Sequence, residues 1–352
     1  MTGPAAPAGE YAVVVPTLGR PSLAACLGAL AEAEGPRPAR VVLVDDRRDP
    51  AVPLTASVPP ALRSRTVVVP GGARGPAAAR NAGWRAAGDA PWIVFLDDDV
   101  VPGPSWADDL ALDLAGASVA TAGIAARVEV PLPADRAPTD WERNVAGLAG
   151  ACWITADMAY RRKALEAVGG FDERFRRAFR EDADLALRVL DAGWTLAEGR
   201  RTTTHPVRPA DRWVSVRLQA GNADDVLMTR LHGRDWWRRA GAPRGRLPAH
   251  LAVTSAGLAA VVCALTGRPR AASACAAGWL AGTAEFATAR TRPGPRTRDE
   301  IVTMVLTSAL VPPAAAWHWL RGQVLHRAAP ARRRASPRSP APAAPAGERL
   351  PT

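Results

Sequence analysis

The stretch WIVFLDDDV, residues 92–100, decides the fold, because five apolar residues are followed at once by three carboxylates. A short apolar run without polar alternation, rich in β-branched and aromatic residues, predicts a strand buried on both faces. Such strands belong to parallel sheets that are covered by helices. The carboxylates then lie at the carboxyl end of the strand, where ligands collect in sheets of this kind.

Working outward, similar runs predict strands at residues 11–16 and 41–44 and an edge strand at 66–69. Helical patterns lie between them, at residues 22–33 and 76–87. The order strand, helix, strand, strand, helix, strand predicts an α/β fold with a mainly parallel sheet flanked by helices.

Further along the chain, strands are expected at residues 118–124 and around 151–157. Helices are expected at 106–115, 162–168 and 182–192. The predicted organisation has four parts: a flexible N-terminus at 1–10, a catalytic domain at 11–225, an Ala-rich helical region at 226–327, and a disordered Pro/Ala/Arg-rich tail at 328–352.

The helical region contains three weakly hydrophobic stretches, residues 251–265, 271–284 and 301–316. Each is shorter than the roughly 20 residues that a membrane-spanning helix needs. Arginines separate them and tryptophans lie near their ends, as is typical of a membrane interface. We therefore expect contact with a membrane surface. The alternative is a small Ala-rich bundle that packs on the catalytic domain.

The formal net charge of +11 does not indicate nucleic-acid binding, because it is concentrated in one region. Thirteen arginines and four acidic residues follow Leu265, a net +9, which leaves +2 for the rest. No nucleic-acid motif accompanies the charge, so no nucleic-acid partner is expected.

Four cysteines without a CxxC pair indicate a reducing compartment. Residues 1–10 lack a secretory pattern, and we expect the catalytic domain to lie at the cytoplasmic face of the cell membrane.

The carboxylates of residues 97–99 are candidate ligands of a divalent metal. Asp97 and Asp99 alternate on the chain and can converge on one Mg²⁺ or Mn²⁺, which prefer oxygen ligands. Such an ion would neutralise the diphosphate of a nucleotide. A solvated acidic turn that caps the next helix is the alternative interpretation.

Other polar residues are expected at the same sheet edge. Asp45 and Asp46 follow the second strand and could bind a base or a ribose hydroxyl, although turn formation would explain them as well. Arg80, on the helix after GGARG, could contact phosphate or serve a structural hydrogen bond.

The sequence EDADL, residues 181–185, is the candidate for proton transfer. A carboxylate at the start of a helix can take a proton from an acceptor hydroxyl, and Asp182 is preferred over Glu181 for this role. Acids that complement the helix dipole are the alternative. His205, in Thr-His-Pro, could complete the metal site.

The motifs occur in one order. They are PTLGRP (16–21), VDD (44–46), GPAAARNAGW (75–84), FLDDDV (95–100), GACWITADMAYRR (150–162), GGFDE (169–173), EDADLALR (181–188) and His205. Over about residues 11–225 this order resembles the family 2 glycosyltransferases with a GT-A fold. The resemblance implies a nucleotide-sugar donor.

The resemblance also implies roles for individual residues. The first-strand motif falls on Pro16 and Thr17, and the base-binding carboxylate on Asp46 or Asp45. The DXD metal motif falls on Asp97 and Asp99, with Asp98 near the donor, and the later histidine on His205. The acceptor-side pair falls on Glu181 and Asp182, the second being the general base.

The expected function is therefore inverting, metal-dependent transfer of a hexosyl or deoxyhexosyl group to a hydroxyl acceptor. The acceptor is expected to be a cell-envelope glycan or a lipid-linked precursor. Two alternatives stay open. A nucleotidyltransferase would use paired carboxylates and a metal too, but it would need a Gly-rich phosphate loop after the first strand. An inactive membrane-attached scaffold would retain the fold without the chemistry.

Overall fold

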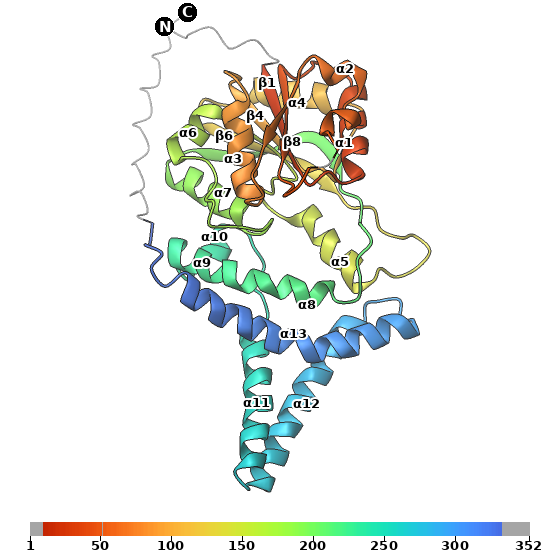
Figure 1. Cartoon of the computed structure of the whole chain (residues 1–352), viewed down its shortest axis with the longest axis vertical. Helices are drawn as coiled ribbons and strands as arrows, with labels where there is room; N and C mark the ends of the chain where they lie inside the picture. The colour runs from red at the N-terminus through yellow and green to blue at the C-terminus, as the bar shows by residue number, and fades with distance from the viewer. Residues whose placement is uncertain (1–9, 51, 333–352) are drawn as a thin grey trace, which may run out of the picture.

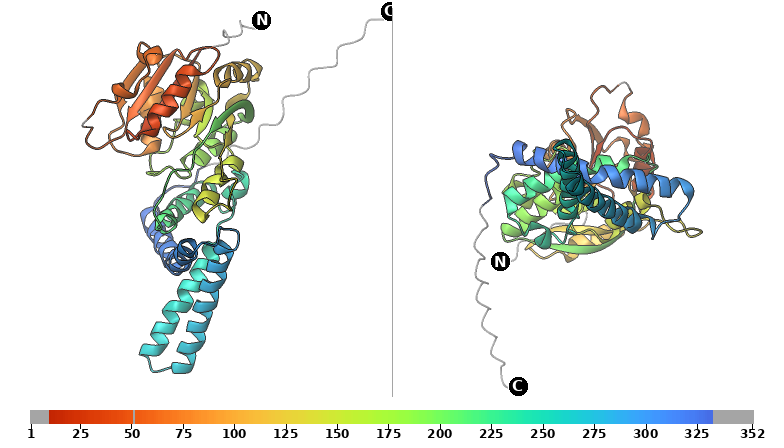
Figure 2. Two further views of the ribbon diagram at one scale, coloured as in Figure 1. Left: turned by 90° about the vertical axis from the view of Figure 1, so that its right-hand side faces the viewer. Right: turned by 90° about the horizontal axis from the view of Figure 1, so that it is seen from below.

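The computed structural model describes residues 10–50 and 52–332. An α/β domain forms one end of the molecule, and short helices together with the long helix α13 (Arg298–Leu325) lie beneath it (Figure 1). Helices α11 (Leu247–Leu265) and α12 (Pro269–Thr291) form an antiparallel hairpin that projects away from both (Figure 2). The hairpin is therefore the most isolated part of the described chain.

One eight-stranded sheet forms the α/β domain, in the order β3-β2-β1-β4-β7-β6-β8-β5. Its first four strands in this order are parallel; β7 is antiparallel to β4 and β6, β8 is parallel to β6, and β5 is antiparallel to β8. The strands are β1 (Tyr11–Thr17), β2 (Arg40–Asp45), β3 (Thr66–Pro70), β4 (Trp92–Leu96), β5 (Val101–Pro102), β6 (Thr121–Glu129), β7 (Asp157–Arg161) and β8 (Thr195–Thr204). The predicted α/β class is confirmed, with a parallel first half and a mixed second half.

Helices cover both faces of this sheet, and β1 shows why. Val13 and Val15 point into the apolar cluster under α1 and α4, whereas Ala12 and Val14 point into the cluster under α3 and α7. Alternate residues of a strand face opposite sides, so a continuous apolar run is what a doubly covered strand requires. The principal helices are α1 (Ser22–Glu32), α3 (Pro76–Ala86), α4 (Trp106–Gly116), α6 (Arg162–Val168) and α7 (Glu181–Asp191).

Short helices fill the layer between the sheet and α13. They are α5 (Asp140–Ala146), α8 (Val214–Leu218), α9 (Asn222–His232) and α10 (Trp236–Arg239), while α2 (Pro60–Arg63) lies beside β3. Three short 3₁₀ helices, η1 (Leu54–Ser57), η2 (Gly147–Gly150) and η3 (Gln219–Gly221), complete the described elements. Helix α9 runs without a break across residue 225, where the sequence placed the end of the catalytic domain.

The C-terminal helices are longer than the apolar stretches that predicted them. They contain 19, 23 and 28 residues. Charged and polar residues extend α12 and α13 beyond their apolar parts, whereas α11 begins earlier, with Leu-Pro-Ala-His. The expectation that each stretch is too short to span a membrane is therefore wrong for α11 and α13, which have the length and composition of spanning helices. The predictions for residues 1–9 and 333–352 lie outside the described residues.

We predict that Gly83→Ala destabilises the α/β domain. A Cβ at Gly83 would lie 2.2 Å from Val14 Cγ1 and 2.9 Å from Val44 Cγ2, so α3 would have to move away from the sheet. Overpacking of this kind costs about 1–3 kcal/mol of unfolding free energy. The control is Gly28→Ala in α1, where nothing lies within 4 Å and a gain in helix propensity is expected. Thermal unfolding of the two variants should shift in opposite directions, and equal midpoints would contradict this packing.

Candidate active site

A cleft of about 690 Å³ opens at the carboxyl ends of β1, β2 and β4. This is the edge where the sequence placed the acidic residues, and it is the usual ligand position in such sheets. Its walls carry carboxylates, one histidine and six arginines. The lining residues are Pro16, Thr17, Leu18, Arg20, Asp46, Arg48, Ala73, Arg74, Gly75, Pro76, Ala79, Arg80, Asp97, Asp98, Asp99, Leu148, Arg176, Ala178, His205 and Arg208.

Asp98 joins the ends of two neighbouring strands. Its Oδ2 accepts a hydrogen bond from Thr17 Oγ1 at 2.6 Å, and its Oδ1 accepts one from Arg20 Nη1 at 2.9 Å. The side chain is buried, so the carboxylate depends on these donors for its stability. Thr17 and Asp98 thus fix the floor of the cleft.

Asp46 holds the loop that follows β3. Its two oxygens accept hydrogen bonds from the backbone N–H groups of Arg74 and Gly75, at 3.0 and 2.9 Å. At Gly71 a Cβ would lie 2.6 Å from Asp46 Oδ1, so the loop approaches this closely only with glycine. Gly75 has φ of 94°, in the left-handed region, and precedes α3. Asp46 therefore positions the loop that carries Arg74.

Arg80 is the centre of the site. It is 1% exposed, and its guanidinium donates to Asp97 Oδ1 and to Glu181 Oε1, both at 2.7 Å. Burial alone would lower the pKa of Arg80, but the two carboxylates raise it above the usual value, so the group is a permanent cation. One side chain of α3 thus joins the end of β4 to the start of α7.

The two acids at the start of α7 are destabilised in their charged forms. Burial raises the pKa of Glu181, and Arg80 only partly opposes this shift. Burial also raises the pKa of Asp182, against the hydrogen bond that its carboxylate accepts from the Ala183 N–H at 2.7 Å. Asp182 retains partial exposure, whereas Glu181 is 2% exposed. A carboxylate with a raised pKa is a stronger base, which suits proton removal.

Arg180 fixes the entry to this helix. It has φ of 75°, a strained conformation for a residue with a side chain, and it lies directly before Glu181. Its guanidinium lies 4.3 Å from the centroid of Phe179 and 4.7 Å from that of Trp236, and Nε is 2.8 Å from Asp225 Oδ1. These contacts stabilise the turn that presents the acidic pair.

Asp99 and His205 lie together on the opposite wall. His205 Nε2 is 3.7 Å from Asp99 Oδ1, and Asp99 Oδ2 is paired with Arg208 Nε at 2.9 Å. His205 Nδ1 is 3.3 Å from the Pro206 carbonyl oxygen, so a proton on Nδ1 would leave the Nε2 lone pair facing the carboxylate. This tautomer is the one a metal ligand requires.

The chemistry of these side chains fits a divalent ion. Asp97, Asp99 and His205 supply oxygen and nitrogen donors from two neighbouring segments to one cleft. Among the described residues, no group of three or more His, Cys, Asp or Glu side chains is already close enough together to hold a metal ion. Arg80 and Arg208 pair with the two carboxylates instead, so an ion would have to replace Arg208 at Asp99.

Most of the residues selected from the sequence line this cleft. They are Pro16, Thr17, Asp46, Arg80, Asp97, Asp98, Asp99 and His205. Glu181 lies behind the wall, joined to it by Arg80, and Asp182 follows it at the start of α7. Asp45 points elsewhere and forms a two-point pair with Arg47, which lowers the pKa of Asp45. Their roles in the reaction stay predictions.

The sequence analysis did not select five arginines that line the cleft. They come from loops after β1, β2, β3, β8 and before α7, and they are Arg20, Arg48, Arg74, Arg176 and Arg208. In a chain with many arginines their sequence spacing carries no signal, although Arg20 lies inside the quoted PTLGRP motif. Together they make the cleft suited to a polyanion.

The α/β sheet with acidic strand ends and an arginine-lined cleft has the GT-A-like fold that the motifs predicted. Residues 12–168 match the family model described as glycosyl transferase family 2. The resemblance predicted from the motifs is confirmed, and glycosyl transfer is favoured over nucleotidyl transfer.

A solved structure agrees with the fold. Mannosyltransferase PcManGT from Pyrobaculum calidifontis, in complex with GDP-Man and Mn²⁺, is 20% identical, with a TM-score of 0.54, and the match covers 88% of this chain and 86% of that one. S. aureus TarS 1–349 is 14% identical, with a TM-score of 0.40 and coverage of 90% and 91%. A search of curated proteins finds no match.

We predict that Arg80→Met destabilises the protein by about 3–5 kcal/mol near neutral pH, because Asp97 and Glu181 lose their buried counter-charge. Without Arg80 their folded-state pKa values rise further above those of the unfolded chain. Protonation then relieves the cost, so the deficit should shrink as the pH falls from 7 toward 5.

The matched control is Arg85→Met, an exposed position on the same helix. Its effect on the unfolding free energy should be small and independent of pH. Denaturant unfolding of both variants at several pH values provides the measurement. A constant deficit for Arg80→Met across this range would show that the buried ion pairs do not control stability.

Proposed function

We propose that the protein is an inverting, metal-dependent glycosyltransferase that moves a sugar from a nucleotide-diphosphate sugar to a hydroxyl group of a membrane-linked acceptor. One observation carries this proposal: Arg80 binds Asp97 on the cleft side and Glu181 beside Asp182. The donor side and the base side of the reaction are thereby held in one fixed unit.

The cleft supports binding of the donor. Arg48, Arg74 and Arg176 line it together with Arg20 and Arg208, and guanidinium groups bind phosphate oxygens through paired hydrogen bonds. A nucleoside diphosphate fits this charge and the volume of about 690 Å³. PcManGT was solved with GDP-Man, and a mannosyl donor is a reasonable first probe.

The metal would be held by Asp97 and Asp99, with His205 as a further ligand. When bound, the ion supplies positive charge to the diphosphate and stabilises it as a leaving group. Arg208 currently neutralises Asp99, and it is partly exposed on a loop, so it can leave this carboxylate without disturbing a buried core. Arg80 keeps Asp97 in place while this exchange happens.

Asp182 is the proposed general base. It removes the proton of the acceptor hydroxyl while this oxygen forms a bond to the anomeric carbon and the bond from that carbon to the diphosphate oxygen breaks. Attack from the side opposite the leaving group inverts the configuration. Glu181 stays paired with Arg80 and keeps the start of α7 in position.

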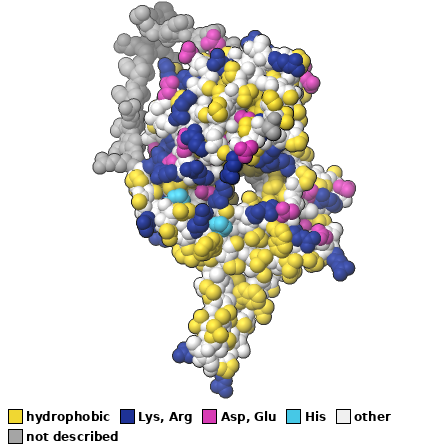
Figure 3. Space-filling model, in the orientation of Figure 1, with side chains coloured by type: hydrophobic (Ala, Val, Ile, Leu, Met, Phe, Trp, Pro, Cys, Tyr) yellow, Lys and Arg dark blue, Asp and Glu magenta, His cyan; other side chains and the backbone are white. Residues whose placement is uncertain are grey.

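Membrane contact is proposed for the hairpin. Between Arg246 and Arg268 helix α11 contains no charged side chain, and its 19 residues rise about 28 Å, close to the hydrocarbon thickness of a bilayer. Its apolar residues are largely exposed, and Leu258 is 64% exposed. Figure 3 shows an apolar hairpin surface with basic side chains at its end. Such a surface is stable in lipid and unfavourable in water.

Helix α13 is proposed to lie along the membrane surface. One face packs on α9, where Gly322 lies against Ala223, and the other exposes a run of apolar residues. The helix crosses the base of the hairpin, beneath the catalytic domain (Figure 1). The exposed residues are Ile301, Val302, Val305, Leu306, Leu310, Trp317, Leu320, Val324 and Leu325. An acceptor embedded in the cytoplasmic face would then be presented to the cleft.

We predict that one nucleoside diphosphate, together with Mn²⁺, raises the melting temperature of the purified protein. At 100 times its dissociation constant a ligand stabilises the folded state by about 2.7 kcal/mol. Asp97→Asn should abolish the part of the increase in melting temperature that depends on Mn²⁺. Asp182→Asn should keep this stabilisation and reduce sugar transfer into extractable lipid by about 10²–10⁴-fold.

Glu166→Gln, at an exposed position of α6, is the control and should behave like the unmodified protein. Retained transfer in Asp182→Asn would exclude it as the base. Stabilisation without any transfer in the unmodified protein, with every acceptor extract, would favour the inactive scaffold.

We predict that the full-length protein floats with phospholipid vesicles and stays bound after a high-salt wash. Leu258→Arg combined with Val262→Arg should release it, because each charge in the hydrocarbon costs about 2.5–3.5 kcal/mol. The control is Val119→Arg, at a 91% exposed position of the catalytic domain. A protein that remains soluble without vesicles or detergent would contradict membrane attachment.

A further inference from the structure

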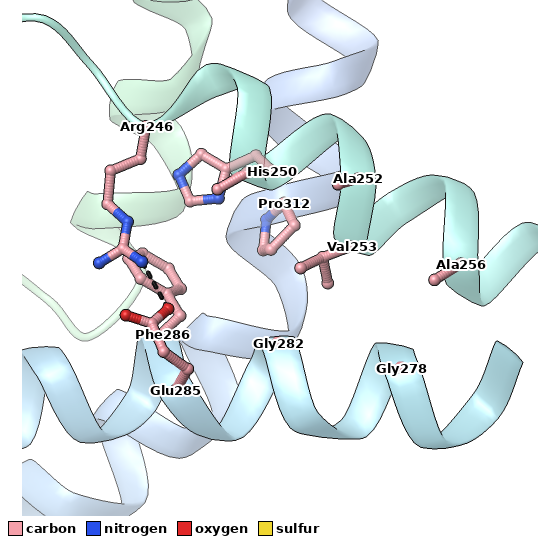
Figure 4. A pocket seen from close by; sticks show the side chains of 11 residues that line it. Arg246, His250, Ala252, Val253, Ala256, Gly278, Gly282, Glu285, Phe286 and Pro312 are labelled. Atoms are coloured by element: carbon pink, nitrogen blue, oxygen red, sulfur yellow. Dashed lines mark hydrogen bonds and ion pairs between the residues drawn. The ribbon is translucent and has the colours of Figure 1, made fainter. Parts of the chain in front are cut away.

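A second cavity lies within the hairpin, where α11 and α12 meet α13. It has a volume of about 420 Å³ and is lined by one face of α11, one face of α12, and Pro312 of α13 (Figure 4). This is within the size range of pockets that bind small ligands. It lies outside the cleft described above and shares no residue with it.

Small residues form the inner wall of this cavity. Val253 and Ala256 of α11 face Gly278 and Gly282 of α12. At Gly282 a Cβ would lie 2.5 Å from Val253 Cγ2, so the helices are in close contact there. At Gly278 the nearest atom to an added Cβ is 3.9 Å away, so there is room at this position of the wall. The wall is apolar and narrow.

The mouth of the cavity is charged. Arg246, directly before α11, pairs with Glu285 of α12, and its guanidinium carbon lies 5.2 Å from the centroid of Phe286 (Figure 4). Both charged side chains are partly exposed and can exchange partners. They also mark the level at which the uncharged part of each hairpin helix begins, so the mouth coincides with the proposed membrane surface.

A third cavity lies next to the hairpin cavity, on its catalytic side. Phe286 lines both the hairpin cavity and a third cavity of about 370 Å³ between α5 and α8, which also contains Arg143 and Arg290. Helix α5 leads directly into η2, whose Leu148 lines the catalytic cleft. The charged mouth of the hairpin cavity therefore lies on the side of the hairpin that faces the catalytic domain.

We propose that the hairpin cavity binds the hydrocarbon chain of the phosphate-bearing lipid that carries the acceptor, with the lipid phosphate at Arg246. The inference rests on the proposed membrane-bound function. An apolar wall beside the bilayer favours a hydrocarbon chain over any polar occupant. Arg246 supplies the complementary charge by exchanging Glu285 for the phosphate. The cavity thus selects a single-chain anionic lipid from the surrounding membrane.

The test uses the full chain in detergent and a long-chain polyprenyl phosphate as probe, with binding measured by native mass spectrometry. Ala256→Trp should fill the cavity and weaken binding at least tenfold. Leu258→Trp, which places the same side chain on the exposed outer face of α11, should not. Arg246→Gln should weaken binding, and inorganic phosphate should not compete. Stabilisation by the nucleotide and Mn²⁺ verifies that each variant is folded.

Two outcomes would overturn the inference: equal binding by Ala256→Trp and the unmodified protein, or full competition by inorganic phosphate. Vesicle flotation separates this failure from a failure of the membrane proposal. A protein that floats but does not bind the probe at this cavity leaves the membrane attachment intact and contradicts only the lipid site. A protein that binds no vesicles contradicts both.

Discussion

The rest of the site depends on one buried cation. Arg80 has no access to water, and a guanidinium in that environment is tolerated only while both of its carboxylate partners stay in place. Glu181 depends on Arg80 in turn, since without Arg80 it would be an unpaired buried charge. Helix α3 is held close to the sheet by the tight contact of Gly83 with Val14, and this sets the depth at which Arg80 enters. Packing at one glycine thereby determines the spacing of groups that come from distant parts of the sequence.

Carboxylates of the cleft stabilise the fold as well as the proposed ligand. Asp98 joins β1 to β4, and Asp46 holds the loop before α3, so replacing either would move the cleft walls as well as remove a charge. Asp99 differs, because its partner Arg208 is partly exposed on a loop. Arg208 therefore balances the charge of Asp99, and this exchangeable pair lies at the position proposed for the metal. A mutation of Asp46 or Asp98 can therefore reduce activity by disturbing the structure. A mutation of Asp99 is expected to disturb the structure less.

The sequence predicted those parts of the fold that arise from local patterns. Strand β4 and helix α6 have their predicted bounds, because a dense apolar run and flanking turn residues define each end. Strand β6 begins at Thr121, later than expected. The strand expected around 151–157 is wrong, because residues 151–156 lie outside any strand and β7 spans Asp157–Arg161. The sequence also identified the acids of the site. It could not predict which arginine meets which acid, because the Arg80–Glu181 pair spans 101 positions and depends on tertiary packing.

The C-terminal helices and the catalytic domain are joined by a second buried arginine. Arg290 of α12 donates to Thr307 and Ser308 of α13, to Asp140 of α5 and to Ser215 of α8. A guanidinium with this many partners in a buried position resists displacement, since moving any one helix leaves polar groups unsatisfied. The hairpin is therefore fixed relative to α5, and α5 continues into η2 at the wall of the cleft. If the hairpin lies in a bilayer, this connection fixes the height of the cleft above the membrane surface. The headgroup of the acceptor then has to span the distance from the membrane surface to the cleft. The distance between the lipid phosphate and the reactive hydroxyl would therefore help to determine which acceptors are used.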